Sequence, residues 1–106
     1  MRYLGIDVGS SFIKAALLDT SNQQVMDITK QPTPKRIPND NMNIYEVNVR
    51  SIVDCVKSMI IEHISKRGPV AGILFSTQMH GFVLCDEAGE PVTNYISWQD
   101  TRGMNP

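Results

Sequence analysis

The sequence lacks a long apolar run, a block of basic charge and paired cysteines. Its apolar segments are far shorter than the roughly 20 residues that a membrane-spanning helix needs. Acidic Asp7 interrupts the first apolar segment, whereas a secretion signal has an uninterrupted one. Ten Lys and Arg against eleven Asp and Glu give a formal charge of −1, whereas nucleic-acid binding favours a clustered positive face. The only cysteines, Cys55 and Cys85, lack the spacing of a metal or redox motif. These absences predict a cytoplasmic protein with reduced thiols that binds neither nucleic acid nor membrane.

The apolar pattern of the 106 residues predicts an α/β fold. Residues 3–7, 11–19 and 24–30 are short apolar segments separated by turn residues, which favours three strands of an antiparallel meander. The stretch 31–44, with its three prolines, is expected to be a surface loop. Residues 70–76 predict a fully buried strand, parallel to the first.

A helix is expected over residues 48–66, where apolar side chains recur at three- and four-residue spacing and predict one buried stripe. Asn48 is the expected N-cap, and Gly68 is expected to end the helix. Residues 82–98 predict a hairpin around the turn 87–90. One helix leaves the second face of the sheet uncovered, so we expect completion by further polypeptide, or dimerisation through that face.

A phosphate-binding turn is one interpretation of Asp7-Val8-Gly9-Ser10-Ser11-Phe12-Ile13-Lys14, which matches neither G-x-G-x-x-G nor a Walker loop. A glycine lets the backbone approach a ligand closely, and turn N–H groups with two serine hydroxyls suit an anion. Lys14 would neutralise phosphate charge, and Asp7 would hold Mg²⁺ directly or through water. An ordinary hairpin turn explains the same residues equally well, because Asp, Gly and Ser are common turn formers.

A second motif, Ser76-Thr77-Gln78-Met79-His80-Gly81, follows the last predicted strand, at the end where open α/β sheets place ligands. Gln78 and His80 offer hydrogen-bonding groups to a polyol, and Met79 offers a polarizable wall. The structural alternative makes His80 a satisfied histidine and Met79 part of the core.

The third motif is Ser97-Trp98-Gln99-Asp100-Thr101-Arg102. Trp98 would form an aromatic wall of a cleft, with the Asp100 carboxylate recognising hydroxyl groups. An Asp100–Arg102 pair behind a core tryptophan is the equally reasonable alternative.

In order and spacing, the three motifs resemble the N-terminal part of the FGGY carbohydrate kinases, most closely the xylulokinase-like branch. The resemblance is carried by residues 4–11 with Lys14, by 76–81 and 98–102, and by the turn 86–91. It implies the actin-like ATPase fold, also called ribonuclease-H-like, with residues 1–106 as a partial N-terminal domain that holds the phosphate loop and part of the sugar site.

By the same resemblance, the parent protein would phosphorylate a hydroxyl of a sugar or polyol, such as the ketose xylulose, with ATP and Mg²⁺. The remaining kinase chain is the implied partner, and a homodimer is left open. Carried over by position, Gly9, Ser10, Ser11 and Lys14 would face the phosphates, Asp7 would lie by Mg²⁺, and Gln78, Met79, His80 and Asp100 would serve the sugar. The catalytic base and adenine pocket are expected beyond Pro106, so we expect the chain alone to be inactive.

Two departures from the family pattern bear on these expectations. The first departure lies just before the predicted helix, in Tyr45-Glu46-Val47-Asn48-Val49, where only Glu46 matches the sequence motif of the family. Trp98-Gln99-Asp100 stands where xylulokinases commonly have Trp-Asn-Asp, so the identity of the sugar substrate is left open. Glycerol kinases have Arg-Glu at the positions of Met79-His80, which argues against glycerol as the substrate. The alternative function is a non-catalytic actin-like module that binds a nucleotide or a partner.

Overall fold

The computed structural model describes residues 1–104, which form two compact units. The first unit comprises residues 1–33 and 53–78. The second comprises residues 34–52 and the segment that begins at Met79.

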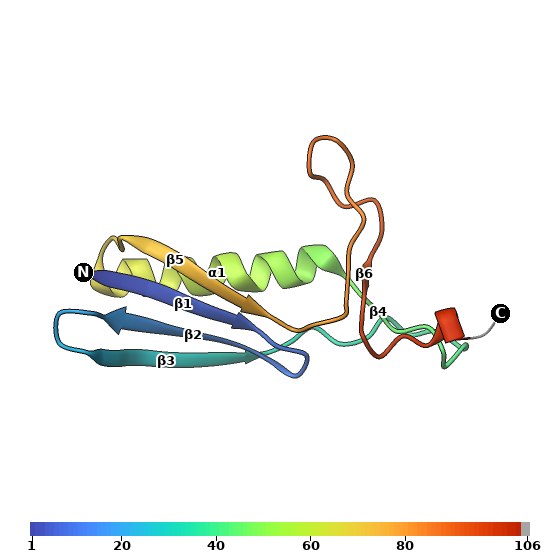
Figure 1. Ribbon diagram of the computed structural model, residues 1–106, viewed down its shortest axis with the longest axis horizontal. Helices are drawn as coiled ribbons and strands as arrows, with labels where there is room; N and C mark the ends of the chain where they lie inside the picture. Colours follow the sequence, from blue (N-terminus) through green and yellow to red (C-terminus); the bar gives the residue numbers. More distant parts are fainter. Residues whose placement is uncertain (105–106) are drawn as a thin grey trace. The chain divides into compact units, whose positions relative to one another are not determined.

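The first unit is a mixed four-stranded sheet with a helix along one face (Figure 1). β1 (Arg2–Val8), β2 (Phe12–Asp19) and β3 (Gln24–Pro32) form an antiparallel meander. β5 (Gly72–Thr77) pairs with β1 in parallel, so the strand order is β3-β2-β1-β5. The predicted β-β-β-α-β order is therefore confirmed for this unit.

Alternation along β1 and β2 divides the sheet into a packed face and an open face. Leu4 and Ile6 on β1, with Ile13, Ala15 and Leu17 on β2, are buried. Successive side chains point to opposite faces of a sheet, and accordingly Asp7 and Lys14 are exposed. This places the charged side chains on the face opposite the core.

The helix α1 (Val49–Arg67) begins and ends as predicted. The Ser51 N–H donates to Asn48 Oδ1 at 3.1 Å, which makes Asn48 the N-cap. Gly68 ends the helix with φ of 87° and donates its N–H to the Ile64 carbonyl at 2.7 Å. Within residues 1–104, no helix is long and apolar enough to cross a membrane.

The predicted buried stripe of α1 is only partly right. Met59 is buried, but Val53 is 40% exposed, and the buried partner of Met59 one turn later is His63. The His63 ring Nε2 lies 3.0 Å from Thr29 Oγ1 on β3. Thr29 is the cross-strand partner of buried Ala15, so this polar contact identifies the packed sheet face as the one that α1 covers.

The expectation that the strand after the helix is fully buried is wrong for the described part of the chain. Leu74 and Phe75 are 55% and 58% exposed, and β5 lies at the sheet edge with β1 as its strand neighbour. A parallel strand is normally covered on both faces. Residues 1–104 supply one helix for this sheet, which leaves Leu74 open on the uncovered face. Phe75, the cross-strand partner of buried Ile6, is exposed at the sheet edge on the other face.

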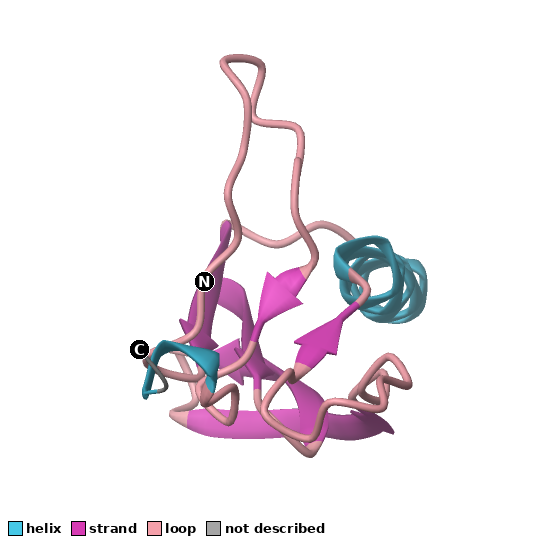
Figure 2. Cartoon of the chain, turned by 90° about the vertical axis from the view of Figure 1, so that its right-hand side faces the viewer, coloured by secondary structure: helices cyan, strands magenta, loops and turns pink. Residues whose placement is uncertain are grey.

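The second unit contains a two-stranded antiparallel ladder of β4 (Glu46–Val47) and β6 (Tyr95–Ile96). The predicted hairpin over 82–98 is confirmed, although its two arms do not form a regular ladder. It consists of two isolated bridges, Phe82 to Ile96 and Cys85 to Pro91, and Figure 2 draws the segment between them as loop. Phe82 is half exposed, so little packing supports longer strands. A short 3-10 turn, η1 (Arg102–Met104), follows.

The loop expected over 31–44 is confirmed from Pro34 onward, while β3 extends to Pro32 and Thr33 is buried. Arg36 organises the loop, because its Nε donates to the Ile44 carbonyl at 2.9 Å. Its Nη2 donates to the carbonyls of Asn39 and Asn41, each at 3.1 Å. The loop is thus held by side-chain bonds to its own backbone.

Candidate functional site

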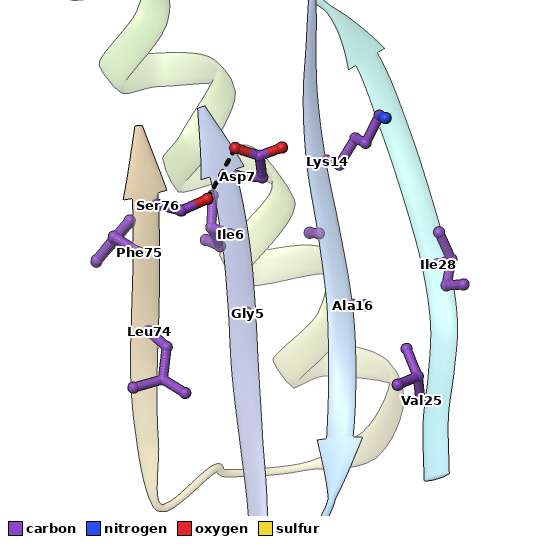
Figure 3. Close-up of a pocket in the computed structure, with 11 residues that line it drawn as sticks. Gly5, Ile6, Asp7, Lys14, Ala16, Val25, Ile28, Leu74, Phe75 and Ser76 are labelled. Carbon is purple, nitrogen blue, oxygen red and sulfur yellow. Dashed lines mark hydrogen bonds between the residues drawn. The ribbon is translucent and has the colours of Figure 1, made fainter. Parts of the chain in front are cut away.

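Three polar side chains lie on the open sheet face of the first unit, near the ends of β1 and β5, with the Lys14 side chain directed toward β3 (Figure 3). Asp7 is the cross-strand partner of Lys14 on β2 and of Ser76 on β5. Directly paired residues share a face of a sheet, and Ser76 Oγ donates to Asp7 Oδ1 at 2.8 Å. A carboxylate, an ammonium group and a hydroxyl are therefore presented together to solvent.

These three side chains lie at one end of a groove of about 400 Å³ (Figure 3). The apolar lining of the groove comes from all four strands: Val25 and Ile28 on β3, Ala16 on β2, Gly5 and Ile6 on β1, and Leu74 and Phe75 on β5. The groove thus joins a charged end to an open apolar floor.

The turn between β1 and β2 accepts only glycine at its first position. The Gly9 N–H donates to the Phe12 carbonyl at 3.0 Å. A Cβ on Gly9 would lie 2.7 Å from that same oxygen, closer than real contacts allow. Ser10 and Ser11 are exposed at the tip of the turn. The turn therefore offers hydroxyl groups and backbone to an anion without a side chain at Gly9 in the way.

Two side chains from outside the hairpin hold the Gly9 carbonyl. Thr33 Oγ1 donates to it at 2.8 Å, and Gln78 Nε2 donates at 3.5 Å. The Gln78 N–H also donates to the Val8 carbonyl at 3.1 Å. The structure thus places Gln78 against the turn of the first unit, while its predicted contact with a sugar stays a prediction.

Ser76 and Thr33 are the residues of this site that sequence reasoning missed. Ser76 carried a signal, because it is the last residue of the strand expected over 70–76, at the end of the sheet where ligands bind. Thr33 carried none, since it lies among prolines in a stretch that predicts only a loop.

The Met79-His80-Gly81 turn belongs to the second unit. Met79 is 72% exposed within residues 1–104, so the interpretation of Met79 as core is wrong for the part of the chain described. His80 is exposed and has φ of 65°, in the left-handed region that few non-glycine residues occupy. Residues in such sparsely populated conformations cluster at active sites and ligand contacts.

Tyr95 on β6 packs against Gly81. A Cβ at position 81 would overlap the Tyr95 hydroxyl and ring, so glycine is required for this contact. Burial raises the pKa of Tyr95, and its hydroxyl has no hydrogen-bond partner among residues 1–104. The ring of Tyr95 therefore limits where the turn 79–81 can lie within the second unit.

Asp100 is held by an ion-pair network in the second unit. Arg102 donates to both of its oxygens through Nε and Nη2, and the Tyr45 N–H donates to Oδ2 at 2.8 Å. Hydrogen bonds from Arg102, followed by those from the backbone of Tyr45 and Arg102, hold the pKa of Asp100 well below its usual range despite its burial. Arg102 also reaches Glu46 Oε2 at 2.9 Å. The Asp100–Arg102 pair of the structural alternative therefore forms, although Trp98, at 52% exposed, is no core residue.

Glu46, the residue that matches the family's sequence motif before the helix, completes this network. The Asn94 side-chain amide donates to Glu46 Oε1 at 3.1 Å. Hydrogen bonds from Asn94 and then Arg102 lower the pKa of Glu46. The network therefore connects β4 with the residues that follow β6.

The predicted site residues thus fall into two groups. Gly9, Ser10, Ser11, Lys14, Asp7 and Gln78 come together in the first unit, whereas Met79, His80 and Asp100 lie in the second. The donor chemistry of the first group fits a nucleotide-bound Mg²⁺, which proteins hold through one or two carboxylates while phosphates supply the other ligands. Asp7 is an exposed carboxylate beside the turn and meets that requirement.

Comparison with known proteins gives consistent matches. The sequence profile of the N-terminal domain of the FGGY family of carbohydrate kinases matches residues 2–105. The chain is 34% identical to a xylulose kinase of Staphylococcus epidermidis over 104 residues, covering 93% of this chain and 20% of the relative. It is 35% identical to glycerol kinase 5 of Bos taurus, covering 93% of this chain and 19% of the relative.

Among solved structures, a gluconate kinase from Lactobacillus acidophilus superposes with a TM-score of 0.80 at 28% identity, covering 93% of this chain and 20% of that one. The expected fold of the N-terminal part of a sugar kinase is thereby confirmed. The chain spans about one-fifth of the length of these relatives.

Proposed function

Since this chain belongs to the FGGY family of carbohydrate kinases, we propose that it is the partial N-terminal domain, over residues 1–106, of a longer enzyme that phosphorylates a sugar or polyol. The proposal rests above all on one observation. The turn 9–11 and the paired side chains of Asp7, Lys14 and Ser76 form a single exposed polar site on the first unit.

In this proposal the first unit binds the phosphates of ATP. Ser10, Ser11 and the turn backbone donate hydrogen bonds to phosphate oxygens, and Lys14 neutralises part of their charge. Asp7 holds the Mg²⁺ that accompanies ATP, and this ion supplies charge neutralisation on the phosphates. Phosphoryl transfer depends mainly on positioning and electrostatic stabilisation, which such a site provides.

The second unit supplies the sugar contacts of the proposal. The His80 imidazole hydrogen-bonds a sugar hydroxyl, with its backbone fixed in the left-handed region, and exposed Met79 provides an apolar wall. Gln78 and Asp100 are further candidates, although Gln78 Nε2 and the Asp100 carboxylate already have partners within the chain. We propose a ketose such as xylulose as substrate, because xylulose kinases are among the relatives.

We further propose that the remaining kinase chain covers the groove between β3 and β5. Leu74 and Phe75 are more than half exposed here, and the relatives are about five times longer than this chain. The aspartate base and the adenine pocket would lie in that remaining chain, so the 106 residues alone would not turn over ATP. The enzyme would act in the cytoplasm, in keeping with its two free cysteines.

The full-length protein tests the function directly. A coupled assay with ATP and a panel of xylulose, gluconate, sedoheptulose and glycerol should reveal turnover with at least one of them. Lys14→Ala should lower kcat/KM for ATP on the order of 100-fold, as removal of a charge-stabilising donor does in other enzymes. Lys35→Ala, on the exposed loop, is the matched control and should retain activity. A well-folded full-length protein that is inactive on the whole panel would contradict the proposal.

A further inference from the structure

The geometry points to Thr33 as a positioning residue that orients the turn 9–11 for phosphate binding. This role rests on the function proposed above and adds a residue to it. Thr33 is the first residue after β3 and one of the few buried polar residues of the first unit.

Thr33 holds the turn through two separate bonds on either side of Ser10. Its hydroxyl donates to the Gly9 carbonyl at 2.8 Å. Its backbone N–H donates to the Ser11 carbonyl at 3.0 Å. Both carbonyls of this short segment are therefore directed toward the same residue.

The direction of the carbonyls determines the direction of the donors. In a trans peptide the N–H points opposite to the C=O of the same unit. The Gly9 carbonyl shares its peptide with the Ser10 N–H, and the Ser11 carbonyl shares its peptide with the Phe12 N–H. Because Thr33 binds both carbonyls, these two N–H groups are directed away from it. The Ser10 and Phe12 N–H groups, separated by Ser11, are thus available on the side of the turn away from Thr33, and backbone N–H groups that converge in a turn favour anions.

The position of Thr33 is itself fixed by the sheet. Phe12 pairs with Pro32, the last residue of β3, so Thr33 follows the strand pairing directly into its contact with the turn. Gln78 at the end of β5 approaches the same Gly9 carbonyl. The turn is therefore held in place before a ligand arrives, which reduces the ordering cost of binding.

The test uses the full-length protein with three variants. Thr33→Val removes the hydroxyl while keeping the side-chain size and the backbone N–H bond. Thr33→Ser keeps a hydroxyl and is the rescue variant. Thr20→Val is the matched control, because Thr20 Oγ1 makes the same kind of bond, to the Met1 carbonyl at 3.0 Å, within the same unit.

Steady-state kinetics should separate the three variants. Thr33→Val should raise KM for ATP roughly fivefold, the effect of about one neutral hydrogen bond, with KM for the sugar nearly unchanged. Thr33→Ser should restore KM for ATP, and Thr20→Val should leave it at the wild-type value. A general loss of stability would not produce a change confined to ATP.

If Thr33→Val matches Thr20→Val in an enzyme that is active as wild type, the inference is overturned while the proposed function stands. If the wild-type protein neither binds nor turns over ATP, the proposed function itself fails. Amide hydrogen exchange of the wild type gives a second test, which holds even if Thr33→Val does not fold. The Thr33 N–H should be protected without ATP, and rapid exchange there would also overturn the inference.

Discussion

Gly9 is the residue at which the turn tolerates least change. A Cβ there would lie 2.7 Å from the Phe12 carbonyl, the acceptor of the Gly9 N–H. Gly9→Ala should therefore lower the free energy of unfolding by about 1–3 kcal/mol, as overpacking does elsewhere, and should weaken ATP binding. Urea unfolding and isothermal titration with ATP measure the two effects.

Gly103→Ala is the control for that substitution, because a Cβ at position 103 meets no atom within 4 Å. It should leave both measurements near wild type. Equal effects at the two positions would show that close approach at Gly9 is unimportant.

Asp100 is the residue whose charge contributes most clearly to the second unit. Its pKa is lowered in the folded state, so its ion pair stabilises the fold above the ordinary Asp pKa of about 3.9 and that contribution is lost as pH falls below it. Asp100→Asn should cost about 1.5–3 kcal/mol at pH 7, the range for hydrogen bonds to charged groups. It should also weaken the acid dependence of unfolding. Thermal unfolding across pH 3–7 measures both.

Asp40→Asn, at an exposed loop position, is the control and should change neither the stability at pH 7 nor the acid dependence of unfolding. If Asp100→Asn instead leaves stability intact and raises KM for the sugar, the carboxylate is a ligand, as the family resemblance implies.

At the level of elements, a β-bulge in β3 brings that strand into contact with the end of α1. The register between β2 and β3 shifts between Ala15 and Leu17, and Asp27 on β3 has φ of 52°. The Asp27 carboxylate accepts from Arg67 Nε at 2.8 Å and from Lys66 Nζ at 3.3 Å. The bulge thus aims a carboxylate at the positively charged last turn of the helix, where the helix dipole also favours cations.

This contact predicts a second acid-dependent contribution. The hydrogen bond from Arg67 is the main cause that lowers the pKa of Asp27 to about 2. The contact therefore stabilises the fold fully above about pH 4 and loses its contribution as pH falls toward 2. Asp27→Asn, which keeps a residue that tolerates the left-handed backbone, should lower the thermal midpoint at pH 7 but change it little at pH 2.

Asp54→Asn on the exposed side of α1 is the matched control, since Asp54 has no ion pair among the described residues. A midpoint for Asp27→Asn that follows this control across the whole pH range would contradict the role of the bulge.

For the whole molecule, the open sheet face gives a prediction about the longer protein. Leu74 is 55% exposed here, and truncation of an exposed leucine costs little. If further chain covers this face, Leu74→Ala in the full-length protein should cost about 2–5 kcal/mol, the usual range for a buried leucine. Urea unfolding measures the difference, and Met42→Ala at an 80% exposed loop position is the control. A cost near zero would mean that the groove stays open in the longer protein.

Local patterns were sufficient for the main elements of the first unit. The meander follows from short apolar segments between turn residues, and α1 follows from helical spacing and the caps at Asn48 and Gly68, all of which act over a few residues. Other features had no local signal. The two-residue strand β4 depends on pairing with β6, and the burial expected of β5 is not found within residues 1–104.

The sequence by itself determined the family, the order of the elements of the first unit and the residue types at each candidate site, because these are properties of short motifs and their spacing. The partners of those residues were decided only by the tertiary structure. Thr33 reaches Gly9 across 24 positions, and Asp100 reaches the backbone of Tyr45 across 55. Such contacts arise when strand pairing brings distant segments together, so no local sequence pattern predicts them.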